Sequence, residues 1–213
     1  MALRLDRDLQ LLVNDEAKVF DSQSRNWSAH AGTVNGAIVS PREAIRWVQR
    51  ESGQPIRPPV AVLGTRKPTP EQSALAEDLG KLLAEVGLTV LCGGRAGIME
   101  DVCRGVAAAG GLSIGLLPDT EADMANPYVT VPLATGIGVA RNALIARAAC
   151  CAVAVGGGYG TLSEIAFALQ FERPVFVLNN APSVAGAVSY ASAEEALDLV
   201  ACALLREPIS GHL

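Results

Sequence analysis

The chain has 213 residues, half of them hydrophobic, and a formal net charge of −5 at pH 7. This length suits one domain, or one domain with a small extension. The acidic balance and the absence of a basic block exclude a cationic stripe for phosphate-backbone binding, so no nucleic-acid partner is expected. No apolar run reaches the ~18 residues that span a bilayer. The first ten residues are charged throughout and lack the apolar core of a secretory signal, so we expect a cytoplasmic protein without membrane contact.

The cysteines give no sign of a metal site. The five cysteines form no CxxC pair and the chain has only two histidines, so we expect no bound metal. Cys150 and Cys151 open an apolar stretch and are interpreted as small buried hydrophobic residues, with a redox role as the less favoured alternative.

The first 57 residues differ in pattern from the rest and predict an N-terminal extension over residues 1–57. Residues 9–15 can form a strand, and residues 24–39 are polar and rich in turn-forming residues. Ser40 followed by Pro41 and Glu43 forms a capping-box pattern, which predicts a short amphipathic helix. Residues 52–59 are typical of a linker.

From residue 58 onward, apolar strands alternate with helices. The pattern predicts strands at 60–64, 88–92, 112–118, 128–133, 151–155 and 174–179, and helices at 69–87, 98–111, 136–149, 161–170 and 192–205. Continuous apolar strands separated by helices indicate a parallel sheet that is covered on both faces. We therefore predict an α/β fold for residues 58–213, a Rossmann-like doubly wound parallel sheet that forms a nucleotide- or phosphate-binding domain.

Three glycine-bearing loops follow predicted strands, at 64–66, 93–97 and 156–161. Ligands of open parallel sheets bind outside the carboxyl ends of the strands. The second and third loops each open a helix, whose free N–H groups attract anions. The sequence thus predicts phosphate near Thr161, with the 93–97 loop as a second wall. Neither a P-loop nor a dinucleotide-binding fingerprint is present.

Glu164 has two interpretations. Thr161 and Glu164 fit a capping box, in which the carboxylate accepts from the backbone of Thr161. Alternatively, Glu164 faces another part of the ligand, such as a ribose, because a carboxylate would repel the phosphate. In either case, we expect Glu164 to lie off the buried face of its helix.

Several polar side chains near these loops are candidates for contacts with an anion. Arg95, inside a glycine loop, is favoured, while Asn142 and Arg66 are weaker candidates. By spacing alone, Arg141 has no function beyond a surface position or an ion pair between helices.

Two stretches resemble a known family. "GGGYGTLSE" at 156–164 resembles the PGGxGTxxE signature of the Lonely Guy proteins, also called lysine decarboxylase-like, and "GGRAGIMED" at 93–101 resembles their first glycine motif. The resemblance covers roughly residues 59–205. It implies a homodimer or higher homo-oligomer that needs no cofactor. The activity it implies is hydrolysis of the N-glycosidic bond in cytokinin nucleoside 5′-monophosphates, or AMP, to the free base and ribose 5-phosphate.

The resemblance also implies roles for individual residues. Glu164 matches the catalytic glutamate, and Arg141 matches the arginine of the family's R-K pair. Together with the glycine-loop argument, this predicts catalytic roles for Arg141 and Glu164, and ligand or phosphate contacts for Gly64, Gly93, Gly94, Arg95, Gly97, Asn142, Gly156, Gly157, Gly158, Gly160 and Thr161.

Three departures from the Lonely Guy pattern resemble a sister branch. Gly156 replaces the signature proline, Asn142 replaces the lysine of the R-K pair, and Arg95 and Glu100 stand in the first motif. That branch includes molybdenum cofactor carrier proteins, which bind a pterin phosphate. Two functions therefore stay open, with the first slightly favoured: a phosphoribohydrolase, or a non-catalytic carrier for molybdenum cofactor, a nucleotide or another phosphorylated heterocycle.

Overall fold

The structure is a computed structural model that describes residues 2–32, 34–178, 181–182 and 184–207. Its contacts divide the chain into two compact units, one drawn from Met1–Arg57 and Asp198–Leu213, the other from Pro58–Leu197. The sequence interpretation placed a boundary at residue 57 but kept residues 198–213 with the larger unit. Within the described residues, every helix is too short or too polar to cross a membrane.

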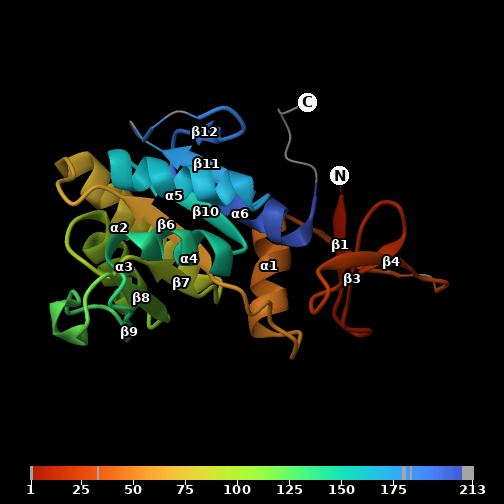
Figure 1. Ribbon diagram of the computed structural model, residues 1–213. Helices are drawn as coiled ribbons and strands as arrows, with labels where there is room; N and C mark the ends of the chain where they lie inside the picture. Colours follow the sequence, from red (N-terminus) through yellow and green to blue (C-terminus); the bar gives the residue numbers. More distant parts are fainter. Residues whose placement is uncertain (1, 33, 179–180, 183, 208–213) are drawn as a thin grey trace. The chain divides into compact units, whose positions relative to one another are not determined.

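The larger unit contains a seven-stranded, all-parallel sheet (Figure 1). Its strand order is β12-β11-β10-β6-β7-β8-β9, with β6 (Val60–Gly64), β7 (Val90–Cys92), β8 (Ser113–Leu117), β9 (Val131–Ala134), β10 (Cys151–Val155), β11 (Val175–Leu178) and β12 (Val188–Tyr190). This confirms the predicted Rossmann-like fold.

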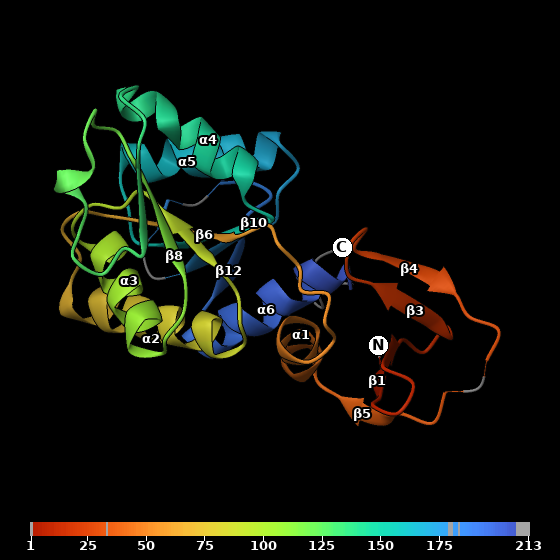
Figure 2. The same ribbon diagram turned by 90° about the horizontal axis from the view of Figure 1, so that it is seen from below.

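Helices cover both faces of this sheet. They are α2 (Pro70–Glu85), α3 (Ile98–Ala108), α4 (Arg141–Ala148), α5 (Tyr159–Gln170) and α6 (Ala193–Leu205), the last of which crosses the boundary between the two units. Figure 2 shows α4 and α5 on one face and α2 and α3 on the other. Alternate strand residues such as Ala61, Leu63 and Ala152 pack against Ile145 of α4 and Ile165 of α5. Successive strand residues point to opposite faces of the sheet, and helices cover both faces, so every residue of these strands is apolar.

Several local features of this unit agree with the sequence patterns, and others differ. Thr69 caps α2 and Pro70 is its first residue, as predicted. The helix predicted from residue 136 starts only at Arg141, because Gly136 and Gly138 have positive φ angles of 66° and 59°, and the 3₁₀ turn η2 (Gly138–Ala140) precedes it. β12 was not predicted, since three residues are too few to show a period. Another 3₁₀ turn, η1 (Ala122–Met124), lies between β8 and β9.

The smaller unit contains a five-stranded antiparallel sheet in the order β4-β3-β2-β1-β5. The strands are β1 (Leu3–Asp6), β2 (Leu11–Val13), β3 (Lys18–Asp21), β4 (Asn26–Ala29) and β5 (Ala37–Val39). The prediction of one strand at 9–15 and a turn-rich stretch at 24–39 was wrong in extent. Strands of three or four residues between polar turns carry too little alternation to be recognised.

The helix of the smaller unit, α1 (Pro41–Arg50), confirms its predicted start. The Glu43 N–H donates to Ser40 Oγ over 3.2 Å, and the Ser40 N–H donates to a Glu43 carboxylate oxygen over 2.8 Å. Both halves of the capping box are therefore formed.

The last part of α6 contacts this smaller unit through polar side chains. Trp27 Nε1 donates to the carbonyl oxygen of Leu205 over 2.7 Å, and Arg42 forms an ion pair with Asp198 over 3.1 Å. The Trp27 ring packs against Phe20 with centroids 5.1 Å apart. These contacts explain why residues after 197 group with the N-terminal strands.

Candidate functional site

A cavity of about 430 Å³ lies at the carboxyl ends of β6 and β10. These two strands are neighbours in the sheet. The chain leaves β6 towards β7 on one side and leaves β10 towards β11 on the other, so the loops after β6 and β10 diverge. Such a switch point leaves a crevice for ligands in open α/β sheets. The lining residues are Val62, Leu63, Gly64, Thr65, Arg66, Gly93, Met99, Val139, Arg141, Asn142, Gly158, Gly160, Thr161 and Glu164.

The N-terminus of α5 opens into this cavity. Its N-cap, Gly158, supplies no side-chain hydrogen bond, and no acidic residue occupies the first turn. No heavy atom lies within 4 Å of the position where a Cβ on Gly160 would stand. By contrast, the first turn of α3 carries Glu100 and Asp101. Of these two helix starts, α5 is therefore the one whose free N–H groups and positive dipole end remain available to an anion.

Glu164 faces the cavity from the buried side of α5. One oxygen of its carboxylate accepts from Arg141 Nη1 over 2.7 Å, and the two side chains are 9% and 8% exposed. The predictions that Glu164 caps the helix or lies off its buried face are both wrong, because α5 begins two residues before Thr161 and turns Glu164 inward. Burial raises the pKa of Glu164, and the positive charge and hydrogen bond of Arg141 partly oppose that rise.

Arg141, the first residue of α4, is held from several sides. Its Nη1 also donates to Asn142 Oδ1 over 2.6 Å. A Cβ on Gly93 would come within 2.4 Å of Nη2, so only glycine lets the guanidinium pack this closely on the loop after β7. Among the described residues, its buried Nε has no hydrogen-bond partner. Because Glu164, Asn142 and the loop after β7 fix the guanidinium, Arg141 presents a preorganised positive charge at the wall of the cavity.

Asn142 links the two helices that frame the cavity. Its Nδ2 donates to Ser163 Oγ over 2.8 Å and lies 3.4 Å from the carbonyl oxygen of Gly160, while its Oδ1 accepts from Arg141. Because its amide is already engaged on both sides, Asn142 positions Arg141 and the start of α5.

The glycine run before α5 differs in backbone geometry from the proline-containing Lonely Guy signature. Gly156 has a φ of +59°, which proline cannot adopt because its ring fixes φ near −65°. Gly157 has a φ of +141°, and a Cβ there would come within 2.5 Å of Thr161 Cβ. The replacement of the signature proline by Gly156 therefore fits the backbone turn that this chain makes.

The predicted site residues divide into two groups around the cavity. Those that line it are Gly64, Gly93, Arg141, Asn142, Gly158, Gly160, Thr161 and Glu164. Those that lie in the same loops without lining it are Gly94, Arg95, Gly97, Gly156 and Gly157. Arg95, the favoured anion contact, instead forms an ion pair with Asp119. Arg66, the weaker candidate, lines the cavity.

Sequence reasoning missed the apolar walls of the cavity. Val62 and Leu63 precede Gly64, the last residue of β6, and Met99 lies in the first turn of α3. Both walls could therefore have been inferred from their positions next to glycine loops. Val139 lies in η2 and is 83% exposed, and no pattern in the sequence indicated it. With a helix N-terminus and buried polar groups beside apolar walls, the cavity suits a ligand with a phosphate and a flat heterocycle.

Known proteins resemble this chain over the larger unit. An uncharacterized protein from Archaeoglobus fulgidus is 34% identical over 139 residues, which cover 65% of this chain and 91% of that protein. The molybdenum cofactor binding protein from Rippkaea orientalis is 33% identical, with a TM-score of 0.63, over 68% of this chain and 96% of that one. The Moco carrier protein from Chlamydomonas reinhardtii is 32% identical, with a TM-score of 0.64, over 70% and 99%.

A sequence profile of the SLOG cluster4 family matches residues 57–202. This range contains both glycine motifs and every residue that lines the cavity. The chain therefore belongs to the SLOG cluster4 family, in the Lonely Guy-like superfamily and close to the molybdenum cofactor carrier proteins.

Proposed function

We propose that this protein binds a phosphorylated heterocycle as a non-catalytic carrier, with cargo of the molybdenum cofactor type. One observation carries the proposal: the uncapped start of α5 and the buried Arg141–Glu164 pair line the same cavity. Two proteins of similar structure, a molybdenum cofactor binding protein and a Moco carrier protein, support the class of cargo. The sequence patterns alone slightly favoured hydrolysis, and this proposal reverses that preference.

The residues present fit such a cargo. Free backbone N–H groups at Tyr159 and Gly160 would hold the phosphate. Arg141 would donate to an acceptor on the body of the ligand, and Val62 and Met99 would pack against its ring. The volume of about 430 Å³ falls in the usual range of small-molecule sites.

A charge placed at Gly160 tests the phosphate position. Gly160→Asp introduces a carboxylate where no atom lies within 4 Å, in a first helical turn that tolerates acidic residues. We expect it to weaken binding of a fluorescent oxidised pterin monophosphate about 10-fold or more, because like charges repel, while the fold stays intact. Gly160→Asn is the matched neutral control. Equal affinity of the two variants, measured by fluorescence anisotropy, would contradict the phosphate position.

Hydrolysis of nucleoside 5′-monophosphates is the second candidate, and the burial and raised pKa of Glu164 favour it. A buried carboxylate with a raised pKa inside a ligand cavity suits a group that takes up or gives up a proton. If Glu164 has this role, free base should form from AMP or isopentenyladenosine monophosphate with the wild type, and Glu164→Gln should lower the rate by about 10²–10⁴. If the protein binds these nucleotides and releases no free base, hydrolysis is excluded and the carrier function remains.

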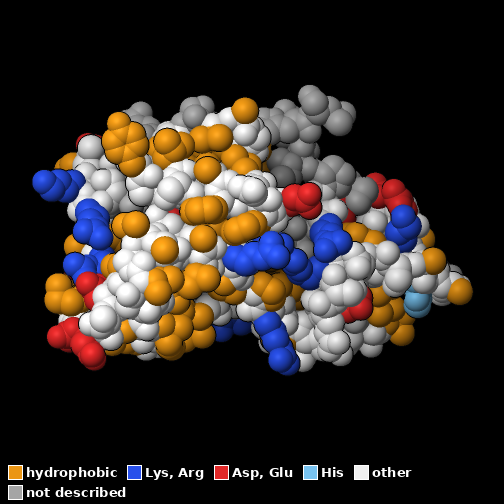
Figure 3. Space-filling model, in the orientation of Figure 1, with side chains coloured by type: hydrophobic (Ala, Val, Ile, Leu, Met, Phe, Trp, Pro, Cys, Tyr) orange, Lys and Arg blue, Asp and Glu red, His pale blue; other side chains and the backbone are white. Residues whose placement is uncertain are grey.

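We also infer a homo-oligomer from a second, apolar groove in the larger unit. It has a volume of about 450 Å³ and is lined by Pro59, Leu91, Ile114, Leu116, Leu133, Leu144, Arg147 and Ala148. Leu133 of β9 and Leu144 of α4 remain 45% and 47% exposed, and Figure 3 shows hydrophobic side chains at several places over α4 and α5. Analytical ultracentrifugation should give an oligomer for the wild type and a smaller species for Leu144→Glu. A monomeric wild type would contradict this inference.

A further inference from the structure

Arg66 and Arg141 both line the cavity, but they differ in whether a carboxylate pairs with them. Arg66 follows β6, lines the cavity and is exposed. Arg141 is paired with Glu164, and Arg95 on the neighbouring loop is paired with Asp119. Among the described residues, neither Arg66 nor the adjacent exposed Lys67 takes part in an ion pair. Arg66 and Lys67 thus leave positive charge at the edge of the cavity, in a chain whose net charge is −5.

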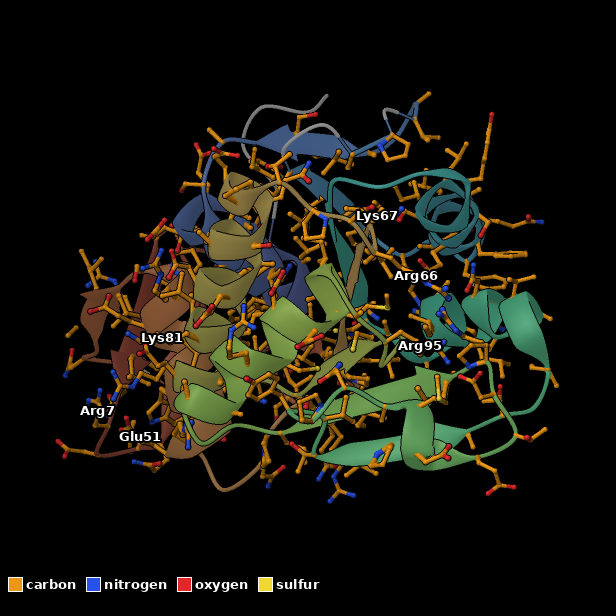
Figure 4. The ribbon with its side chains drawn as sticks, turned by 90° about the vertical axis from the view of Figure 1, so that its left-hand side faces the viewer. Arg7, Glu51, Arg66, Lys67, Lys81 and Arg95 are labelled. Carbon is orange, nitrogen blue, oxygen red and sulfur yellow. The ribbon has the colours of Figure 1, made fainter. Side chains whose placement is uncertain are left out.

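The backbone of Arg66 is held firmly on the β7 side of the cavity. The Ile98 N–H donates to the carbonyl oxygen of Thr65 over 3.0 Å. A Cβ on Gly97, whose φ is +78°, would come within 2.6 Å of Arg66 Cα. The loops after β6 and β7 are thus packed together. Figure 4 shows Arg66 between Lys67 and Arg95, with Lys81 well apart.

The start of α5 lies on the other side of β6, since β10 and β7 flank that strand. The two places that attract anions therefore come from opposite sides of the switch point.

We propose that the ligand carries a second anionic group, remote from its phosphate, and that Arg66 binds it. This rests on the proposed binding of a phosphorylated heterocycle, and it narrows the ligand to molecules with negative charge at both ends. The guanidinium of Arg66 would pair with a carboxylate or another oxyanion through charge-assisted hydrogen bonds. Lys67 adds positive charge to the same edge.

A pair of ligands that differ only at the far end tests the proposal. Adenylosuccinate is AMP with a dicarboxylate attached to the N6 end of the base, opposite the phosphate. Calorimetry with the wild type should give an affinity about 10-fold or more higher for adenylosuccinate than for AMP. Arg66→Gln should abolish that preference, because it should lower the affinity for adenylosuccinate far more than the affinity for AMP.

Two control variants separate the possible failures. Gly160→Asp should weaken binding of both ligands equally, and Lys81→Gln, at an exposed position of α2, should change neither affinity. An unchanged preference in Arg66→Gln, or an equal loss for both ligands, would overturn the second anion site while leaving the binding function in place. Failure of the wild type to bind either nucleotide would overturn the second anion site, whereas the pterin monophosphate assay tests the binding function separately.

Discussion

The guanidinium of Arg141 and the carboxylate of Glu164 form a buried ion pair, with Nη1 and Oε1 2.7 Å apart. The two residues are separated by 23 positions and belong to different helices, α4 and α5. Both line the candidate cavity, so the ion pair that joins α4 to α5 also sets the charge at the cavity wall.

Removal of the arginine alone should be costly. Arg141→Met leaves the Glu164 carboxylate buried without a counter-charge, and we expect the free energy of unfolding at pH 7 to fall by about 3–5 kcal/mol. The double variant Arg141→Met with Glu164→Gln should recover most of that loss, because it leaves no buried charge. Urea unfolding measures both. Lys81→Met, which removes an exposed pair whose atoms are 4.0 Å apart, should cost about 0.5 kcal/mol or less.

The stability should depend on pH through Glu164. Burial raises its pKa in the folded protein above the ordinary value of 4.5. Between the unfolded and the folded pKa, the folded state binds more protons, so the contribution of Glu164 to stability is complete below 4.5 and is lost as the pH rises through the folded pKa. The wild type should therefore lose stability relative to Glu164→Gln as the pH rises from 4 to 8. A difference that changes in the opposite direction would mean that the attraction of Arg141 outweighs burial.

Restoring the family proline at Gly156 should damage this chain. Proline cannot adopt the φ of +59°, and it would also remove the N–H that donates to the carbonyl oxygen of Leu178 over 3.3 Å. We expect Gly156→Pro to lower the free energy of unfolding by more than about 3 kcal/mol. Gly156→Asn should cost less than Gly156→Pro, because asparagine tolerates this backbone region, but its Cβ would come within 2.7 Å of the Gln72 amide that caps α2 and would displace it. Similar melting temperatures for the two variants would refute this account of the loop.

The two tryptophans of the smaller unit should respond differently to replacement by phenylalanine. Trp27→Phe removes the hydrogen bond to the Leu205 carbonyl and should lower the free energy of unfolding by about 1–3 kcal/mol. The buried Nε1 of Trp47 has no partner among the described residues, so Trp47→Phe loses no hydrogen bond and its cost reflects lost volume alone. Hydrogen exchange at residues 198–205 should rise in Trp27→Phe and not in Trp47→Phe. Unchanged exchange in both variants would argue that Trp27 does not anchor this part of α6.

Local rules were sufficient wherever neighbours in the sequence decide the structure. The starts of α1 and α2 follow from Ser40 and Thr69 with the prolines that come next, because capping requires only a side-chain oxygen and an N–H three residues away. The apolar runs at 60–64 and 151–155 form β6 and β10 with the predicted bounds, since a strand buried on both faces needs every side chain apolar. The glycine loops at the ends of those strands then located one side of the cavity.

Tertiary structure decided which charged groups meet. Spacing suggested that Glu164 caps its own helix, but the partner it meets is Arg141 from α4. Arg95 was the better candidate by position, yet Asp119 neutralises it and Arg66 lines the cavity instead. Such pairings depend on how helices and loops pack around the sheet, and the free energy of a buried charge depends on its neighbours in space, which local spacing does not encode.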